Sequence, residues 1–460
     1  MPQVASDSIQ RLPLLALADN RYEDVSKDAR MVNCFAERSP EGDYWINKRV
    51  GMLLYASYGG TGQGMYNWQG DIYTINGGTL RKNGVVVGSV DATNGVYTFS
   101  STLGSTPKLV MGNGVKAYVY DGTTLTQITD PNFPSSFVKG IAYLDGTVYV
   151  MDQKAKIYGS DINDPLTWGA LNNLVAQIEP DNGVALAKQL VYVIALKQWT
   201  TEAFYDAANA SGSPLAPVQG AKSSYGCVSA DTVQSIDDTL IWVSANRSGG
   251  PQVVRMEALT TKVISTKPIE RLLAPAIATA FSSMEFRHDG HRFYVLTNTA
   301  ANLTLSYDLD EGLWYQWTDS DGNYLPIVSA TFDSALNHYW QHETNGNIYL
   351  VDGAYYNDNG KPITVDIITP NYDAGNRRAK KVISSLEVVG DQTPGSLMQV
   401  RRTDDDYTTW STFRTIDLGS RRPRLVNEGS FYRRAYHFRH RSNTPMRVKA
   451  VELQLLMGEA

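Results

Sequence analysis

The sequence predicts an all-β protein: an irregular β-propeller of six or seven blades, followed by a C-terminal β-sandwich-like domain. Alternating apolar segments recur around Asp-Gly or Asn-Gly pairs, as in 117–125 and 141–150. Such pairs favour the tight turns of β-hairpins, because both central residues adopt positive φ. The units repeat at roughly 35–45 residues, the spacing of four-stranded blades. The 27 tyrosines, 9 tryptophans and 38 glycines suit sheets joined by tight turns.

The repeat divides the chain into three parts. Residues 61–364 form the predicted propeller, whose candidate blade units cover 62–91, 97–133, 137–172, 187–222, 231–266, 278–319 and 327–364. The one predicted helix is Ile269–Ala280, with Pro275 cutting into it.

The flanking parts lack the blade period. Residues 1–60 contain two predicted strands, Leu12–Leu17 and Arg30–Glu37, and we expect them to join the C-terminal platform or to close the propeller. Residues 365–460 contain alternating segments such as 382–389 and 446–455, which predict a separate sandwich of about 95 residues. A chain of 460 residues exceeds the usual size of a single core, which also favours two domains.

Composition narrows the function classes. No run of 18 apolar residues is present, and the N-terminus lacks the basic and apolar regions of a signal peptide, so we expect neither a membrane span nor a leader. Cys34 and Cys227 are the two cysteines, and we expect buried free thiols. From residue 370 onward there are 16 basic and 10 acidic side chains, which give this part a net charge of +6. Because the whole chain has a net charge of −6, the preceding residues carry a net charge of −12. This asymmetry favours docking between molecules.

The densest positive charge lies near the C-terminus. Arg421, Arg422 and Arg424 precede the segment Phe431–Arg441, which interleaves arginines with aromatic residues. If this segment is one strand, alternate residues share a face, one forming a basic stripe and the other resembling a core. The stripe consists of Phe431, Arg433, Ala435, His437, Arg439 and Arg441, and the core face of Tyr432, Arg434, Tyr436, Phe438 and His440.

Three interpretations of these arginines stay open. Basic residues among aromatic ones can bind nucleic acid through phosphates and stacking, or they can be plain solvated charge. They can equally form bidentate ion pairs with an acidic neighbouring subunit. The acidic remainder of the chain favours the third interpretation. We therefore take six arginines as candidate residues of a subunit or adaptor interface: Arg421, Arg422, Arg424, Arg433, Arg439 and Arg441.

The six histidines form three close pairs, His288/His291, His338/His342 and His437/His440. His338 and His342 could share one face of a strand and hold a metal, but Glu343 falls on the opposite face, so we expect packed or surface residues. His288-Asp289-Gly290-His291 is more simply a hairpin turn.

Other motifs also suggest turns. Asp319–Asn323 begins like a calcium loop, but Ala330 stands where the closing acid belongs. Thr403–Trp410 resembles the Asp-box of sialidase-like propellers, a folding element, with Tyr407 at the usual glycine. No nucleophile elbow, P-loop or dinucleotide fingerprint is present in the sequence. We predict no catalytic residue, no cofactor and no metal.

Three groups of residues, in order, carry a resemblance that covers essentially the whole chain. The first is Leu12-Pro13-Leu14 with Val32–Glu37, and the second is the first blade, Gly64–Gly88. The third is the Thr-Asp-Asp turn at 403–405 followed by Arg-Arg clusters and the final apolar strand Met446–Leu456. In this order they resemble the tail nozzle proteins of short-tailed phages (podoviruses), also called packaged-DNA stabilization proteins.

The resemblance implies a non-enzymatic structural protein of the virion tail, assembled in the bacterial host cytoplasm. It implies a homo-hexamer stacked below the phage adaptor (head-to-tail) ring and extending the DNA channel. Tail spikes or fibres and a tail needle or plug would be its other partners. Such a nozzle retains packaged double-stranded DNA, without sequence-specific binding, and opens for ejection.

A net-acidic protein suits the wall of a DNA channel. Basic side chains would neutralise phosphates, and each neutralised phosphate would add affinity and so hold the DNA back. The alternative is a carbohydrate-binding or glycoside-cleaving propeller, in which some of the many Tyr and Trp residues would stack on sugars. A glycosidase would need two carboxylates facing one another across a cleft. A monomeric scaffold propeller is a third possibility.

Overall fold

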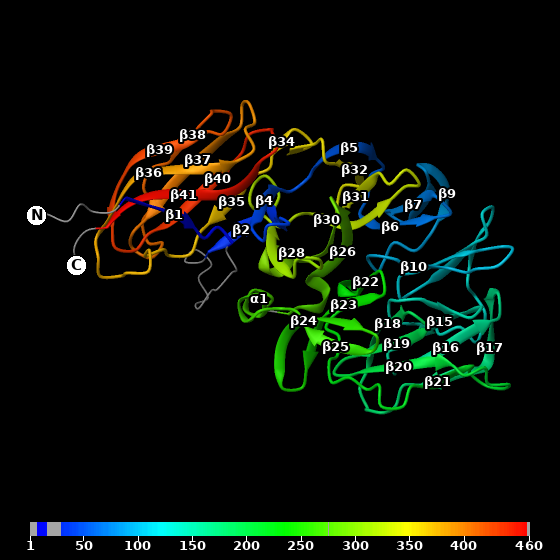
Figure 1. Ribbon diagram of the computed structural model, residues 1–460. Helices are drawn as coiled ribbons and strands as arrows, with labels where there is room; N and C mark the ends of the chain where they lie inside the picture. Colours follow the sequence, from blue (N-terminus) through cyan, green and yellow to red (C-terminus); the bar gives the residue numbers. More distant parts are fainter. Residues whose placement is uncertain (1–6, 16–28, 275, 458–460) are drawn as a thin grey trace, which may run out of the picture.

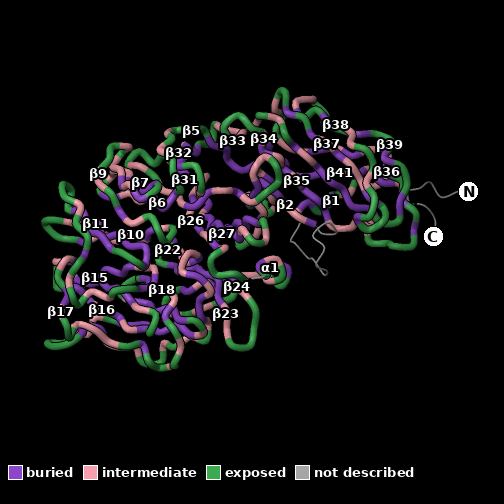
Figure 2. Tube along the Cα trace, turned by 180° about the vertical axis from the view of Figure 1, so that it is seen from behind, coloured by how far each residue is buried: buried purple, intermediate pink, exposed green. Residues whose placement is uncertain are grey.

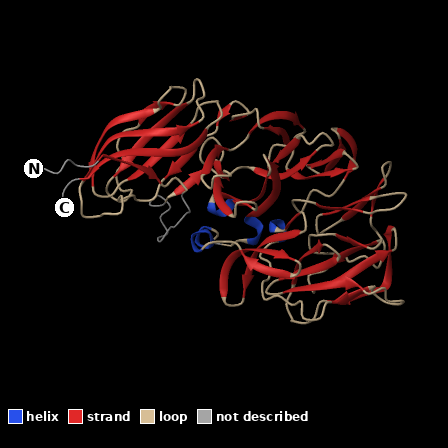
Figure 3. Cartoon of the chain, in the orientation of Figure 1, coloured by secondary structure: helices blue, strands red, loops and turns tan. Residues whose placement is uncertain are grey.

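The computed structural model describes residues 7–15, 29–274 and 276–457 and consists almost wholly of β-strands (Figures 1 and 3). A ring of small sheets lies beside an elongated two-sheet domain, which holds the first and last described strands. Among the described residues, no helix has the length and apolar character needed to cross a membrane.

Five consecutive segments each form a separate antiparallel sheet of four strands, joined strand to strand in sequence order. These are blades 1 to 5. Blade 1 contains β6 (Gly62–Trp68), β7 (Asp71–Asn76), β8 (Thr79–Lys82) and β9 (Val85–Ser89), and blade 2 contains β10 (Thr98–Ser101), β11 (Leu109–Gly112), β12 (Ala117–Tyr120) and β13 (Leu125–Gln127). Blade 3 contains β14 (Ala142–Leu144), β15 (Thr147–Met151), β16 (Lys156–Asp161) and β17 (Asp164–Val175). Blade 4 contains β18 (Gly183–Gln189), β19 (Tyr192–Lys197), β20 (Thr201–Asp206) and β21 (Leu215–Pro217), and blade 5 contains β22 (Gln234–Ile236), β23 (Thr239–Asn246), β24 (Gly249–Glu257) and β25 (Thr260–Val263).

The last two blades pair with strands from the N-terminal part of the chain: blade 6 pairs with one at its edge, and blade 7 takes one as its fourth strand. Blade 6 contains β26 (Phe281–His288), β27 (His291–Asn298), β28 (Leu303–Asp308) and β29 (Leu313–Trp317). Blade 7 contains β30 (Ile327–Phe332), β31 (His338–His342) and β32 (Asn347–Asp352), and its fourth strand is β5 (Gly51–Ser57). The first strands of successive blades contact one another, and β30 contacts β6, so the ring closes. In the part of the chain that the structure describes, the blade count is therefore seven.

One blade boundary differs from the expectation. Residues 353–364 do not supply the last strand of blade 7; they form the short hairpin β33 (Asn357–Asp358) and β34 (Lys361–Pro362). The strand β5 takes that place by pairing antiparallel with β32, from Gly51 opposite Asp352 to Ser57 opposite Asn347. Because β5 directly precedes β6 of blade 1, this pairing joins the first blade to the last.

The sandwich consists of two sheets built from both ends of the chain. One sheet has the order β3 (Cys34–Arg38), β4 (Tyr44–Lys48), β41 (Arg447–Met457), β36 (Lys381–Gly390) and β39 (Arg424–Phe431), with β1 (Asp7–Leu12) also paired to β41. The other has the order β2 (Arg30–Val32), β35 (Val365–Ile368), β40 (Ala435–His440), β37 (Leu397–Thr403) and β38 (Arg414–Asp417).

The second sandwich sheet continues into the propeller. The strand β2 pairs on one side with β35 and on the other with β29 of blade 6, with Val32 opposite Gln316. A single nine-stranded sheet therefore runs from blade 6 through the sandwich.

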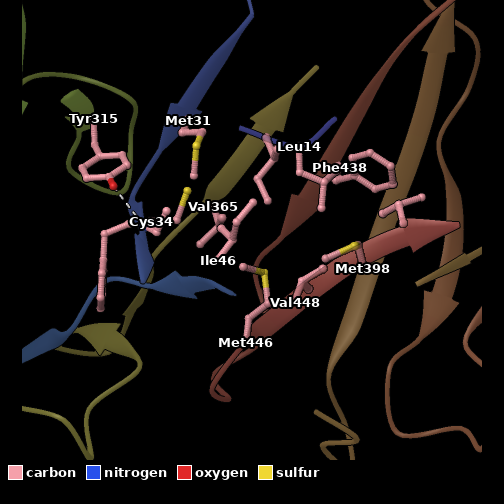
Figure 4. Packing of buried hydrophobic residues seen from close by; sticks show 14 of the residues in the cluster. Leu14, Met31, Cys34, Ile46, Tyr315, Val365, Met398, Phe438, Met446 and Val448 are labelled. Atoms are coloured by element: carbon pink, nitrogen blue, oxygen red, sulfur yellow. Dashed lines mark hydrogen bonds between the residues drawn. The ribbon is translucent and has the colours of Figure 1, made fainter. Parts of the chain in front are cut away.

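The largest apolar core also crosses this boundary. It joins buried residues of blades 6 and 7, such as Phe286 and Trp340, to residues of both sandwich sheets, such as Ile46 and Phe438. Figure 4 shows part of this core, with Tyr315 of blade 6 toward one side and Met398, Met446 and Val448 of the sandwich toward the other. Figure 2 shows buried segments on both sides of this boundary. Propeller and sandwich therefore share one core.

Several local expectations need correction. The N-terminal strand is Asp7–Leu12 and ends before Pro13, which has no N–H to donate to a sheet; Ala16 and Leu17 lie outside the described residues. The segment 30–37 is extended but divides at Asn33, which has positive φ.

The predicted helix is shorter and starts earlier than expected. It is α1 (Lys267–Leu272), and after it comes a 3-10 turn, η3 (Ala278–Ala280); Pro275 lies outside the described residues. Two further 3-10 turns are η2 (Ala230–Thr232) and η4 (Thr299–Ala301). Both cysteines are buried free thiols, as expected, and burial raises the pKa of each.

Candidate functional site: the basic platform and the propeller axis

The arginine-rich segment forms two strands and not one. The strand β39 ends at Phe431 and β40 begins at Ala435, so the predicted alternation of faces from 431 to 441 fails at the turn between them. Tyr432, expected in the core, is 55% exposed, whereas Arg434 is buried. The Arg434 guanidinium binds Asp404 through two hydrogen bonds, of 2.7 and 2.9 Å, and donates another to the Glu428 carbonyl. This arginine stabilises the turn and is not available to a partner.

Arg439 is also committed to the fold. Its Nε lies 2.8 Å from Oδ1 of Asp366, and its Nη2 lies 3.2 Å from Oδ2. Arg401 Nε donates to Nδ1 of the buried His437, so His437 carries its proton on Nε2 and donates it to the same Asp366 over 2.7 Å. Burial raises the pKa of Asp366, but the hydrogen bonds from His437 and Arg439 outweigh burial and lower it to about 2. At this point of the expected stripe, the charge of Arg439 is therefore neutralised by Asp366 of the same chain.

The other predicted arginines lie on the surface. Arg422 forms an exposed ion pair with Glu387, and Arg433 lies 3.5 Å from Asp406. Arg421, Arg424 and Arg441 are exposed and have no ion pair within the described ranges. In that part of the chain these three carry an unpaired positive charge, and Arg433, whose side chain is 45% exposed, also remains accessible to a partner.

The propeller axis is crossed by an ion pair. Lys139, from the connection between blades 2 and 3, reaches Asp231 at the start of blade 5, with its Nζ 2.7 and 2.9 Å from the two carboxylate oxygens. Lys139 lines a cavity of about 580 Å³ at one end of the axis and another of about 810 Å³ at the other end. The pair therefore lies between two mouths of the propeller.

The first mouth also contains a neighbouring cavity of about 500 Å³ lined by Glu285 and by the stacked rings of Tyr66 and Phe99. Burial raises the pKa of Glu285, whose carboxylate accepts a hydrogen bond from Arg287. Arg287 also pairs with Asp237. In this mouth, two acids, Glu285 and Asp237, therefore both pair with Arg287.

These observations agree with a comparison of sequence families. Residues 40–324 match the family described as "Bacteriophage P22 Gp10, beta-propeller". The chain belongs to this family of phage structural proteins. It therefore has a structural role in a virion, within the family of podovirus tail nozzles and packaged-DNA stabilization proteins.

Comparisons beyond the family add little. No curated protein matches the chain. Among solved structures, the computationally designed Ika8 protein matches with 11% identity and a TM-score of 0.40, covering 65% of this chain and 99% of its own. The N-terminal domain of Nup159 has 10% identity and a TM-score of 0.38, covering 70% and 98%, and BamB from Moraxella catarrhalis has 15% and 0.37, covering 65% and 99%. At these scores the fold assignment depends on the chain's own sheets and on the Gp10 family.

The histidine pairs singled out in the sequence contribute to turns and to side-chain packing. His288-Asp289-Gly290-His291 is the β26–β27 hairpin turn, with positive φ at Asp289 and Gly290 as predicted. His338 packs edge-on against Phe286, and His342 lies near Tyr349. Within the described ranges, no group of three or more His, Cys, Asp and Glu side chains could hold a metal ion.

The two turn motifs have clear local functions. Asp319 accepts the backbone N–H groups of Asp321 and Asn323, which closes an ordinary turn. In the Asp-box-like segment, Asp405 accepts hydrogen bonds from Thr403 and Thr409. Tyr407 has positive φ, the conformation for which glycine is usual at that position.

Arg49 is a buried, extensively hydrogen-bonded charge that no sequence motif indicated. Its guanidinium binds Asp358 at the junction of the propeller and the sandwich, and also donates to Asn33 Oδ1 and to the Thr318 and Val50 carbonyls. Both charged side chains are buried. No local signal could have revealed this network, because Arg49 and Asp358 are 309 positions apart.

Proposed function

We propose that the chain is the tail nozzle subunit of a short-tailed phage. Six copies form a ring below the adaptor, extend the DNA channel, retain the packaged genome and open when it is ejected. The observation that carries the proposal is the match to the Gp10 propeller family over residues 40–324. Assembly takes place in the host cytoplasm, and the mature position is the virion tail.

The connection between the propeller and the sandwich supports a mechanical role for the subunit. The sheet shared by blade 6 and the sandwich, the common core and the buried Arg49–Asp358 pair join both parts into one body. A force applied to one part is therefore transmitted to the other. This suits a subunit held between an adaptor ring and distal spikes, fibres or a needle.

The distribution of charge supports ring formation. A closed ring needs two different complementary surfaces on each subunit. The exposed Arg421, Arg424 and Arg441 offer a positive surface, and the net-negative remainder of the chain can supply the other. The propeller axis is crossed by Lys139 and Asp231, so we place the DNA in the lumen of the ring and outside the individual propellers.

Cryo-electron microscopy of the tail or of the purified particle tests this proposal. We expect a sixfold ring with a central channel, stacked on a second ring. A chain that is monomeric in the particle, or absent from the tail, would contradict it. The interface is tested by the triple variant Arg421→Glu/Arg424→Glu/Arg441→Glu, which should lose ring or adaptor binding in sedimentation. Arg377→Glu, an exposed arginine elsewhere in the sandwich, is the matched control.

A further inference from the structure

A second potential site lies at the mouth of the propeller where the first strands of the blades begin. The cavity there has a volume of about 810 Å³, within the range of small-molecule sites. Its walls come from the loops of successive blades: Asn94 before blade 2, Gln153 in blade 3, Asn182 and Gln198 around blade 4, and Asn246 in blade 5. Amide side chains therefore surround much of this mouth.

Several of these polar groups have no partner in the protein. Within the described residues, the side chains of Gln153, Asn182 and Gln198 make no hydrogen bond to another protein group, and neither does the indole N–H of Trp199. Asn182, Gln198 and Trp199 also line a neighbouring cavity of about 290 Å³. The two cavities adjoin at these three residues, so they form successive positions along one groove.

The loop that carries Gln198 and Trp199 is held in place by buried ion pairs and a backbone hydrogen bond. Lys197 is fully buried and lies 2.8 Å from Asp181 and 2.5 Å from Glu202. The Trp199 backbone N–H donates to Asp181 over 2.8 Å. Side chains on a loop held in this way are pre-organised, which reduces the entropy lost on binding.

The groove has balanced charge. In the larger cavity Lys139 and Asp231 neutralise one another. At the smaller one, two carboxylates, Asp181 and Glu202, face the buried Lys197, and the second of these negative charges offsets that of the exposed Arg247. Neither cavity has the cluster of arginines or lysines that phosphate recognition uses. Neutral amides, which donate and accept hydrogen bonds, instead match a ligand with many hydroxyl groups.

We propose that this groove binds a neutral oligosaccharide. Amide side chains would bond the hydroxyl groups, and the half-buried Trp199 would contact the apolar face of a sugar ring. An extended peptide is less suited, because peptide grooves use an exposed strand edge, a row of apolar anchors or an aromatic-lined polyproline groove. This binding function is separate from ring assembly.

The test uses the full-length protein on an array of neutral and anionic bacterial surface oligosaccharides. Titration of the best glycan, followed by tryptophan fluorescence, then gives its affinity. We expect neutral glycans to bind, Trp199→Ala to weaken binding at least about tenfold, and Gln198→Ala or Asn182→Ala to weaken it about 2–10-fold each. Gln127→Ala, an exposed glutamine on β13, is the matched control and should bind as wild type.

Two results would overturn the inference. One is that no glycan on the array binds wild-type protein more tightly than Trp199→Ala. The other is that anionic glycans or a peptide library bind and neutral glycans do not. Thermal unfolding of each variant checks its folding; if Trp199→Ala is unfolded, the exposed Gln198→Ala and Asn182→Ala carry the test. The oligomeric state of wild-type protein is measured separately, so failure here leaves the nozzle proposal intact.

Discussion

The propeller and the sandwich are both all-β, but they assemble in opposite ways. In blades 1 to 5 every sheet is made from strands that are consecutive in the sequence, and most of them are joined by short turns. In the sandwich the chain's two ends meet: β1 pairs with β41 from Asp7 opposite Leu456, and β4 pairs with the same strand at Ile46 and Val448. Local turns therefore specify the blades, whereas the sandwich depends on pairing between remote segments.

The two regions also differ in how far their ion pairs are buried. At the junction with the sandwich, Arg49 and Asp358 are buried and fully bonded. On the propeller axis, Lys139 and Asp231 remain 12% and 26% exposed. The Arg49–Asp358 pair therefore has the features of a structural connection, whereas the Lys139–Asp231 pair lies on an accessible surface.

The largest effect is expected for the shared core. Phe286→Ala in blade 6 should lower the free energy of unfolding by about 3–5 kcal/mol and increase hydrogen exchange in β36 and β41 of the sandwich, because its core is continuous with theirs. Phe204→Ala in blade 4 removes an equally buried phenylalanine from a separate cluster. It should be similarly destabilising but leave sandwich exchange unchanged. Equal exchange in both variants would show that the two regions are not coupled.

The junction pair should come next. Arg49→Ala leaves Asp358 buried without its partner, and we expect a loss of about 3–5 kcal/mol in denaturant unfolding. Arg377→Ala breaks an exposed pair with Asp373 and should cost less than about 1 kcal/mol. The double variant Arg49→Met/Asp358→Leu should recover part of the loss, and no recovery would mean that the other hydrogen bonds of Arg49 dominate.

Two arginines of the predicted stripe should now behave differently. Arg439→Glu places a negative charge beside Asp366 and should destabilise the sandwich by about 3 kcal/mol. Arg433→Glu changes an exposed side chain and should alter stability by less than about 1 kcal/mol. Sedimentation should then show reduced ring or adaptor assembly for Arg433→Glu with its folding intact. If Arg439→Glu unfolds like wild type, the Asp366 cluster is not structural.

The last prediction concerns the pH dependence of stability. Burial lowers the pKa of His440 in the sandwich to about 3, while an unfolded histidine has a pKa near 6.5. Between these values the unfolded state binds more protons, so stability should fall as the pH decreases, by up to about 1.4 kcal/mol per unit. Asp366, with a pKa of about 2, adds stability above pH ~4 that is lost as the pH falls toward 2. Unfolding titrations of His440→Gln should show a shallower slope above pH 4; an unchanged slope would assign the effect to other groups.

Much of the propeller could be predicted from sequence because its information is local. Asp-Gly and Asn-Gly turns, such as Asp145-Gly146, fix both the hairpin and its register. The Gp10-family resemblance likewise followed from motifs in order along the chain. The six arginines of the predicted interface were found as a sequence cluster, but their separate roles were not. Arg439 and Arg422 pair with the chain's own acids, while Arg421, Arg424 and Arg441 are exposed without an ion pair in the described part of the chain.

The sequence by itself determined the Asp-Gly and Asn-Gly hairpin turns, the blade period and the uneven charge, since each can be read from the order of residues along the chain. Only the tertiary structure decided that β5 completes blade 7, that Arg49 meets Asp358, and that amides from several blades surround one groove. These arrangements join segments far apart in the chain. Their partners are chosen by burial and by the need to satisfy every buried polar group, which no local pattern records.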